Sequence, residues 1–326
     1  MVSPRLSLVL DGQDQPQKVV VYRPRAGVDL SDLSGSQVHI VQGFKPDYDA
    51  FVAEGFAAST APEGQYDLGI VCVPRAKREA RALIADAASR CARVIVDGQK
   101  TDGIDSLLKD VRKLADVTKL ISKAHGKAFA FAGGDFADWT DPGALGSVEG
   151  FETRLGVFSA DRIDKASAAL VAALPAKLPA KLADFGAGWG YLSRHILNCD
   201  GVKRLTLVEA EATALDCARA NIDDPRAVFT WADVTSFTAK PGFDGIIMNP
   251  PFHTTRAADP GLGQAVIASA ARCLAPHGQL WMVANRHLPY EATLAEHFGA
   301  VEELEGTPAF KILLASKPLR AGKRSS

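Results

Sequence analysis

The chain has 326 residues, of which 47% are hydrophobic and 23% are charged, and its formal net charge is -1. This length exceeds one typical hydrophobic core and suits a globular enzyme of two domains. The near-zero charge excludes a global basic field of the kind that attracts nucleic acids, although a local basic patch is still possible.

Five cysteines are spread along the chain without a CxxC pair or a His/Cys cluster, which predicts reduced thiols, no disulfide framework and no metal site. The apolar stretch that ends at Leu10 is too short for a signal peptide or a membrane span. We therefore expect a cytoplasmic protein without membrane attachment, and we expect it to be a monomer. The cysteines are Cys72, Cys91, Cys199, Cys217 and Cys273.

Apolar runs alternate with helix-spaced segments in both halves of the chain. In the first half, residues 38–41, 67–73 and 93–96 are predicted to be buried strands, and residues 76–91 a helix. A segment rich in glycine and other helix breakers lies between Gly133 and Gly156. The second half has predicted strands over residues 182–184, 205–209, 228–231, 243–248, 279–284 and 310–315. This alternation indicates parallel sheets, so we expect two α/β domains of one general type.

A glycine-rich turn over residues 184–190 follows a predicted strand and opens a helix over residues 191–197. Glycines at such a turn let the backbone approach a ligand closely. The spacing is GxGxG, not the GxGxxG of dinucleotide sites, so a methionine-type carboxylate and amine suit it better than a pyrophosphate. The turn therefore predicts S-adenosylmethionine as cofactor, bound by Asp184, Gly186, Gly188 and Gly190.

Two acidic residues follow the next two strands of the second half. Glu209 ends a strand about 25 residues beyond the turn, where a carboxylate can accept both ribose hydroxyls. Asp233 follows the next strand, where it could receive the adenine amine. Either acid could instead be a solvated residue at a strand end, and that alternative is stronger for Asp233.

The segment Asn-Pro-Pro-Phe-His, residues 249–253, comes directly after the fourth strand and faces the same crevice as the glycine turn. An aryl amine is a poor nucleophile, and the Asn249 amide oxygen and the Pro250 carbonyl could accept its two N–H hydrogens. Phe252 could stack on a flipped base. We expect Asn249, Pro250 and Phe252 to be catalytic, Asn249 to bind the cofactor as well, and Phe252 and His253 to contact the substrate. The alternative is a proline turn without chemistry.

With these residues, the chain resembles the bacterial ribosomal RNA small subunit methyltransferase C family and its large-subunit relative. The resemblance covers essentially the whole chain. Its most specific segments are GVFS at residues 156–159 leading to Asp164, DFGAGWG at 184–190, NPPFH at 249–253, VANRHLPY at 283–290, and Phe310 with Lys311. One departure is Trp189, which is bulkier than the residue usual at that point of the turn.

The resemblance implies two tandem Rossmann-like class I methyltransferase domains, of which the N-terminal one is degenerate. It implies a degenerate domain over residues 1–135, a linker and lid over 136–165 and a catalytic domain over 166–326. Residues 42–46, after the strand we take as the first, lack a glycine triplet and contain Lys45. The implied reaction is methylation of a guanine N2 amine in ribosomal RNA, with the small subunit favoured. The implied substrate residues include Phe158 and Asn285.

Basic residues cluster in two runs of the first half and in the C-terminal tail, where they could contact phosphates or form solvated helix faces. Two other functions are compatible with these residues. One is an amine methyltransferase that acts on adenine or on a protein glutamine, and the other is a non-catalytic RNA-binding assembly factor. The basic residues are Arg75, Lys77, Arg78, Arg81, Arg90 and Arg93, then Lys109, Arg112, Lys113, Lys119, Lys123 and Lys127, then Lys311, Lys317, Arg320, Lys323 and Arg324.

Overall fold

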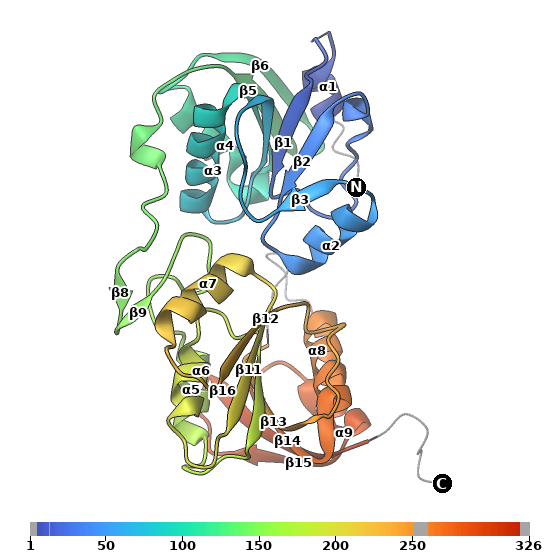
Figure 1. Cartoon of the computed structure of the whole chain (residues 1–326), viewed down its shortest axis with the longest axis vertical. Helices are drawn as coiled ribbons and strands as arrows, with labels where there is room; N and C mark the ends of the chain where they lie inside the picture. Colours follow the sequence, from blue (N-terminus) through green and yellow to red (C-terminus); the bar gives the residue numbers. More distant parts are fainter. Residues whose placement is uncertain (1–4, 13, 251–259, 320–326) are drawn as a thin grey trace. The chain divides into compact units, whose positions relative to one another are not determined.

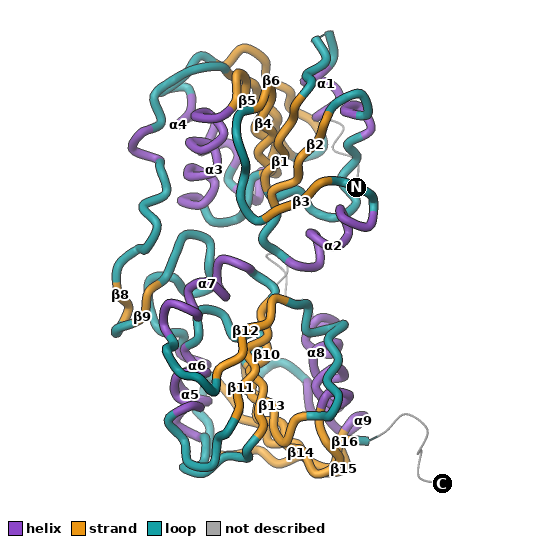
Figure 2. Tube along the Cα trace, viewed as in Figure 1, coloured by secondary structure: helices purple, strands orange, loops and turns teal. Residues whose placement is uncertain are grey.

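The computed structural model describes residues 5–12, 14–250 and 260–319. The contacts of the chain divide it into two compact units, Met1–Ala144 and Leu145–Ser326 (Figure 1). Each unit contains a seven-stranded mixed sheet (Figure 2). The predicted fold class, two α/β domains of Rossmann-like type, is confirmed.

In the N-terminal unit the strands lie in the order β3-β2-β1-β4-β5-β7-β6, and β7 runs antiparallel to both of its neighbours. The strands are β1 (Lys18–Tyr22), β2 (Gln37–Val41), β3 (Ala57–Ser59), β4 (Tyr66–Cys72), β5 (Cys91–Gln99), β6 (Val117–Lys123) and β7 (Gly126–Phe131). The helices are α1 (Leu6–Leu10), α2 (Lys45–Ala53), α3 (Lys77–Arg90) and α4 (Ile104–Val111), with short 3-10 turns at Ser31–Leu33, Lys100–Asp102 and Ala137–Trp139.

The core of this unit follows the two-residue period of β1. Val19 and Val21 pack with α1 and α2 on one face of the sheet, whereas Val20 and Tyr22 pack with α3 and α4 on the other. All four side chains are buried. A strand that is apolar on both faces is typical of a parallel sheet covered by helices on both sides.

The C-terminal unit repeats this topology, with the strand order β12-β11-β10-β13-β14-β16-β15. Its sheet comprises β10 (Lys181–Phe185), β11 (Arg204–Glu209), β12 (Ala227–Trp231), β13 (Phe243–Met248), β14 (Leu274–Asn285), β15 (Phe298–Leu304) and β16 (Phe310–Pro318). The helices are α5 (Lys165–Ala173), α6 (Tyr191–Leu197), α7 (Ala212–Asn221), α8 (Pro260–Cys273) and α9 (Tyr290–His297), and a small hairpin joins β8 (Ser147–Val148) to β9 (Phe151–Glu152).

Helices cover both faces of this second sheet. Leu182 of β10 packs in one core cluster with α5, α6 and α7, and Ala183 and Phe185 pack in another with α8 and α9. The two groups of helices flank the strands in Figure 1. The pairing of β10 with both β11 and β13 makes β10 the strand at which the chain reverses direction across the sheet. In open sheets of this kind, ligands bind beyond the carboxyl ends of the strands at that point.

The topology corrects one prediction about the N-terminal half. Residues 38–41 lie in β2, the second strand, because β1 occupies the central position that β10 has in the other unit. The counterpart of the glycine turn is therefore not residues 42–46 but residues 23–27, Arg-Pro-Arg-Ala-Gly. The sequence prediction overlooked the strand Lys18–Tyr22, so it took the second strand of this unit for the first.

A buried ion pair joins the first residues of the described chain to the N-terminal sheet. Arg5 is 2% exposed, and its Nε and Nη2 donate to the two carboxylate oxygens of Asp97 at 2.6 and 3.1 Å. Its Nη1 donates to the carbonyl of Lys123 at 3.0 Å. The carboxylate neutralises a guanidinium that water does not reach.

We predict that Asp97→Ala lowers the free energy of unfolding of this unit by roughly 3–5 kcal/mol, because Arg5 would remain buried without its counter-charge. Urea titration of the variant and of the wild type measures this difference. Asp105→Ala is the control, since it removes the partly exposed ion pair with Lys127 and is expected to change stability little. Equal effects of the two substitutions would contradict the prediction.

Candidate active site

The glycine turn lies between the end of β10 and the start of α6, as the sequence predicts. Gly186 and Gly188 have φ angles of 74° and 55°, and a Cβ atom at either position would meet open space. Both glycines line a cavity. A side chain would therefore fill space that a ligand could occupy, and the left-handed backbone favours glycine at both positions.

Gly190 has a different environment. Its φ is 92°, and a Cβ atom there would lie 2.9 Å from Ile222 Cδ1 and 3.3 Å from Ala218 Cβ. This glycine precedes α6 and allows the turn to pack closely against α7 and the residue after it. Its predicted cofactor contact stays a prediction, while its packing role is visible.

Asp184 is completely buried at the end of β10. Its Oδ2 accepts a hydrogen bond from Ser193 Oγ of α6 at 2.7 Å, whereas its Oδ1 has no hydrogen-bond partner among the described residues. Burial raises the pKa of this carboxyl to about 7, with the Ser193 hydrogen bond acting in the opposite direction and the nearby Glu209 adding a smaller increase. One buried oxygen is thus left for another donor.

Glu209 ends β11, and its carboxylate contacts the glycine turn directly. Oε2 accepts from the backbone N–H of Gly188 at 2.7 Å, and Oε1 accepts from that of Glu211 at 2.8 Å. Burial raises the pKa of the carboxyl, and the backbone donors oppose that rise. The structure therefore brings Asp184, Glu209 and the glycine turn together at one edge of the sheet.

Asp233 lies two residues beyond β12, and its carboxylate oxygens accept from the backbone N–H and the hydroxyl of Thr235, at 2.8 and 2.7 Å. These bonds close a local turn, which agrees with the alternative that Asp233 is a solvated residue at a strand end. Contact with a cofactor stays a prediction for this residue.

Asn249 follows β13 and is held by its amide nitrogen. Nδ2 donates to Asp164 Oδ2 and to Ser167 Oγ, both at 2.9 Å. The amide oxygen Oδ1 is buried and has no hydrogen-bond partner among the described residues. Pro250 is buried beside it, while Phe252 and His253 lie outside the described residues.

The cavity at this edge is lined by the glycine turn, by Asn249 and by a segment that precedes α5. Phe158 of that segment is 67% exposed, and its carbonyl accepts a hydrogen bond from Trp189 Nε1 at 2.8 Å. The Trp189 ring is itself buried, 5.0 Å from the ring of Phe151. The bulky residue of the turn thus anchors the segment that presents Phe158.

Asn285 ends β14, the neighbour of β13, so it lies at the same edge of the sheet as Asn249. The following residue, Arg286, donates to Glu303 Oε1 at 2.8 Å and to the carbonyl of Thr307 at 3.0 Å. The substrate contacts proposed for Phe158 and Asn285 stay predictions.

Sequence reasoning named Asp164 only as part of a motif and overlooked Ser167 and Ser193. Asp164 caps the N-terminus of α5 by accepting from the Ser167 backbone N–H at 2.8 Å. The spacing of Asp164 and Ser167 is a helix-start signal that the sequence offered. Their contact with Asn249 spans more than 80 residues and has no local signal.

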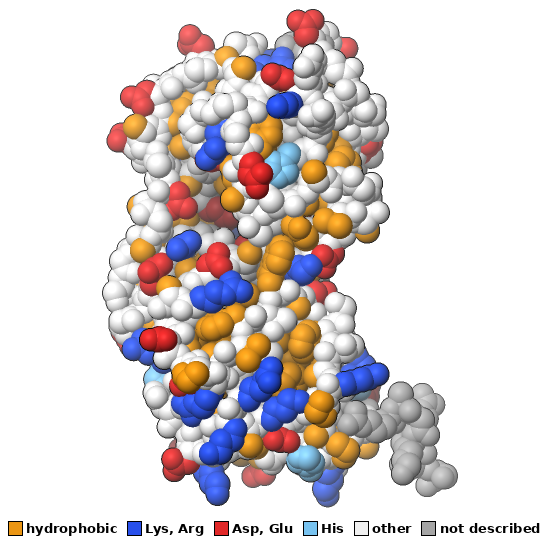
Figure 3. All heavy atoms as spheres, viewed as in Figure 1, with side chains coloured by type: hydrophobic (Ala, Val, Ile, Leu, Met, Phe, Trp, Pro, Cys, Tyr) orange, Lys and Arg blue, Asp and Glu red, His pale blue; other side chains and the backbone are white. Residues whose placement is uncertain are grey.

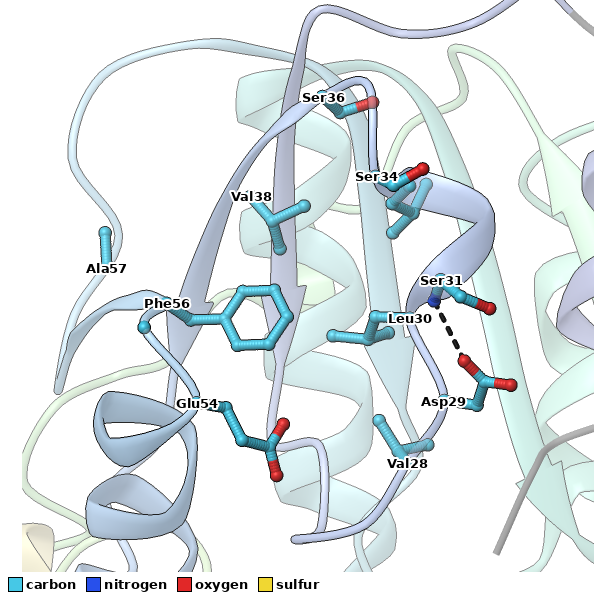
Figure 4. A pocket seen from close by; sticks show the side chains of 12 residues that line it. Val28, Asp29, Leu30, Ser31, Ser34, Ser36, Val38, Glu54, Phe56 and Ala57 are labelled. Carbon is cyan, nitrogen blue, oxygen red and sulfur yellow. Dashed lines mark hydrogen bonds between the residues drawn. The ribbon is translucent and has the colours of Figure 1, made fainter.

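A cavity of about 450 Å³ lies in the N-terminal unit (Figure 4). Its lining includes Val38 near the amino end of β2 and Ala57 at that of β3, together with Asp29 and Glu54. This is the opposite edge of the sheet from the one that holds the glycine turn in the other unit. The cavity is therefore not the counterpart of the candidate active site.

Several basic residues of the N-terminal unit form ion pairs with carboxylates. Their ion pairs are Lys77 and Arg81 with Asp110, Arg90 with Asp86, and Lys127 with Asp105. Arg75, Arg78 and Arg112 are exposed and make no ion pair with the described residues.

The prediction that Lys311 belongs to a basic C-terminal tail is wrong. Lys311 is 3% exposed and pairs with Glu291, so it belongs to the interior of the C-terminal unit. Lys317 is exposed, and Arg320, Lys323 and Arg324 lie outside the described residues.

Over residues 5–12, 14–250 and 260–319, no group of three or more His, Cys, Asp or Glu side chains could hold a metal ion. In the same part of the chain, no helix is both long and apolar enough to cross a membrane. The five cysteines are free thiols.

The fold and this site define a Rossmann-like methyltransferase. The family model described as "Methyltransferase small domain" matches residues 149–314. The chain is 30% identical over 295 residues to the ribosomal RNA small subunit methyltransferase C of Shewanella sp. (strain MR-4), covering 85% of each protein. The protein of that name from Pseudomonas paraeruginosa (strain PA7) is 29% identical over 79% of this chain and 81% of its own length. The chain belongs to the ribosomal RNA small subunit methyltransferase C family, as its sequence motifs predict.

A solved structure shows the same fold over both units. It is described as the T. thermophilus 16S rRNA N2 G1207 methyltransferase (RsmC) in complex with AdoMet and guanosine. Its TM-score is 0.76 at 24% identity, and the match covers 92% of this chain and 88% of that one.

We predict that Asp184→Asn stabilises the cofactor-free protein increasingly as the pH rises from about 4 to about 7. A carboxyl whose pKa is raised by folding contributes its full stability below its ordinary pKa and loses it as the pH rises through the raised value. The asparagine does not ionise, so the variant avoids that loss. Thermal unfolding between pH 4 and 8 measures the difference. Asp161→Asn, at an exposed carboxylate, is the control, and a pH-independent difference at position 184 would contradict the prediction.

Proposed function

We propose that this protein transfers the methyl group of S-adenosylmethionine to the exocyclic N2 amine of a guanine in small-subunit ribosomal RNA. The observation that carries this proposal is the Asn249 amide oxygen, which is buried without a partner among the described residues beside the cavity of the glycine turn. The family relatives support the substrate class, since they bear the name of a small-subunit rRNA methyltransferase.

The residues of the turn fit this cofactor. Open space beside Gly186 and Gly188 admits a ligand against the backbone, and the unpartnered Asp184 Oδ1 suits a donor such as an amine. Glu209 is placed to accept ribose hydroxyls, because its carboxylate ends the neighbouring strand. When bound, S-adenosylmethionine supplies an electrophilic methyl group on a sulfonium centre.

The chemistry left to the protein is to place a weak nucleophile. The Asn249 oxygen accepts one N–H of the guanine amine, and the Pro250 carbonyl accepts the other, so the nitrogen lone pair is aimed at the methyl carbon. Methyl transfer to the nitrogen would break the sulfur–methyl bond and leave its electron pair on a neutral thioether sulfur, and the nitrogen would release one proton to solvent. This arrangement requires no strong general base.

The same two acceptors could also bind the amine of adenine or of a protein glutamine. Family membership favours guanine as the substrate. A non-catalytic assembly factor would have no need for an oriented amide beside an open glycine turn. We further propose that the protein works in the cytoplasm as a monomer and that the unit from about residue 166 onward, after a lid, carries the reaction.

The N-terminal unit is proposed to bind rRNA phosphates through the exposed arginines near the start of α3 and the end of α4. These ends lie together, since Lys77 and Arg81 of α3 both reach Asp110 of α4. Lys and Arg side chains also gather on the face of the C-terminal unit shown in Figure 3, so the catalytic unit can share the phosphate contacts.

We predict that Asn249→Ala lowers the rate of methyl transfer roughly 10²-fold or more while cofactor affinity changes little, because the lost oxygen acts mainly in the transition state. Small subunits from a strain that lacks the methyltransferase are the substrate. Mass spectrometry identifies the methylated nucleoside, and calorimetry gives the cofactor affinity. Asn198→Ala is the control, since Asn198 is exposed beyond α6. Near-normal turnover of Asn249→Ala, or a wild-type product other than N2-methylguanosine, would refute the proposed reaction.

We predict that reversing Arg75, Arg78 and Arg112 to glutamate weakens subunit binding and lowers its salt dependence by about one unit of slope for each lost phosphate contact. Cofactor affinity is expected to stay unchanged. The control carries the same charge change at three exposed basic residues outside the predicted basic runs, Lys18, Arg25 and Lys100. An equal salt slope in the two triple variants would show that the arginines form ordinary solvated surfaces.

A further inference from the structure

The amide of Asn249 is fixed by two acceptors on α5 and its cap. Its two N–H hydrogens are directed to Asp164 Oδ2 and Ser167 Oγ, each at 2.9 Å. The same Asp164 oxygen accepts the Ser167 backbone N–H at 2.8 Å, so the helix start holds the carboxylate in place. No donor among the described residues reaches the Asn249 oxygen.

These contacts decide which end of the amide faces the cavity. An ionised carboxylate can only accept, so Asp164 requires a donor from Asn249 and disfavours the flipped amide, which would bring two oxygens together. The serine hydroxyl can donate or accept and would tolerate either orientation. Asp164 therefore sets the direction, and Ser167 occupies the second N–H.

We propose that Asp164 is a positioning residue for methyl transfer: through the Asn249 amide it presents an oxygen, and not an N–H group, to the substrate. This inference rests on the proposed function, because it assigns the oxygen to the reacting amine. This orientation of the amide also limits which chemical group of the substrate can bind opposite Asn249. The group opposite Asn249 must donate a hydrogen, as an exocyclic amine does, and a carbonyl edge of a base would find no donor there.

Kinetics with four variants separate positioning from structure. Asp164→Ser keeps an oxygen that can cap α5 but is too short to reach Asn249, and Ser167→Ala keeps the backbone donor of the cap. Asp164→Asn retains an acceptor oxygen for both bonds. Asp161→Ser changes a neighbouring exposed carboxylate and is the matched control.

We expect Asp164→Ser to lower kcat about 10- to 100-fold while KM for the subunit and cofactor affinity change less than about threefold. Asp164→Asn should recover most of the lost kcat, Ser167→Ala should lose less, and Asp161→Ser should match the wild type. The proposal is overturned if Asp164→Ser keeps a normal kcat, or if it raises KM without lowering kcat.

A spectroscopic measurement tests the contact without relying on activity. The chain contains four asparagines, Asn198, Asn221, Asn249 and Asn285, so ¹⁵N-asparagine labelling gives four side-chain amide signals. The signal lost in Asn249→Ala identifies the residue. In Asp164→Ser its two protons should shift and exchange faster with solvent, and in Asp161→Ser they should not. An unchanged signal in Asp164→Ser refutes the positioning role, whereas a wild-type protein that makes no N2-methylguanosine refutes only the proposed reaction.

Discussion

The parallel pairing of β10 with both β11 and β13 determines where the candidate catalytic residues lie. Asp184 pairs with Leu207 on one side and with Ile247 on the other, so the ends of three strands meet at one edge. Glu209 and Asn249 each follow these paired positions by two residues. Sheet register alone therefore brings together two acids and an amide from distant parts of the sequence, and the glycine turn crosses the same edge.

The N-terminal unit has the same register and different residues. Val21 pairs with Ile40 and Ile70, and so holds the position of Asp184. Counting two residues onward places Gln42 where Glu209 stands and Cys72 where Asn249 stands. The Gln42 amide is satisfied within its own loops, since Nε2 donates to the Pro24 carbonyl and Oε1 accepts from the Phe44 N–H. The unit thus keeps the fold while these positions lack the carboxylates and the free amide oxygen of the other site.

Local sequence signals predicted the glycine turn and the helix that follows it in the C-terminal unit. The predicted helix over residues 191–197 coincides with α6, because glycines break the chain immediately before an apolar helical pattern. The run over residues 18–22 was overlooked, and one missed strand displaced the assignment of the first loop in the N-terminal half. The bonds from Asn249 to Asp164 and Ser167 span 85 and 82 residues and depend on side-chain orientation, which no spacing rule encodes. The direction in which the Trp189 ring packs escaped prediction for the same reason.

The pairing of Asn249 with Asp164 also explains why an amide suits this position better than a carboxylate. In the proposed reaction, residue 249 donates to Asp164 and accepts from the substrate, and asparagine has one group for each of these bonds. A carboxylate there would face the carboxylate of Asp164 at close range, and one of the two would have to hold a proton. That proton would make the acceptor strength of the site vary with pH. An amide keeps the acceptor neutral and its direction constant, which suits a reaction that depends on placing a weak nucleophile.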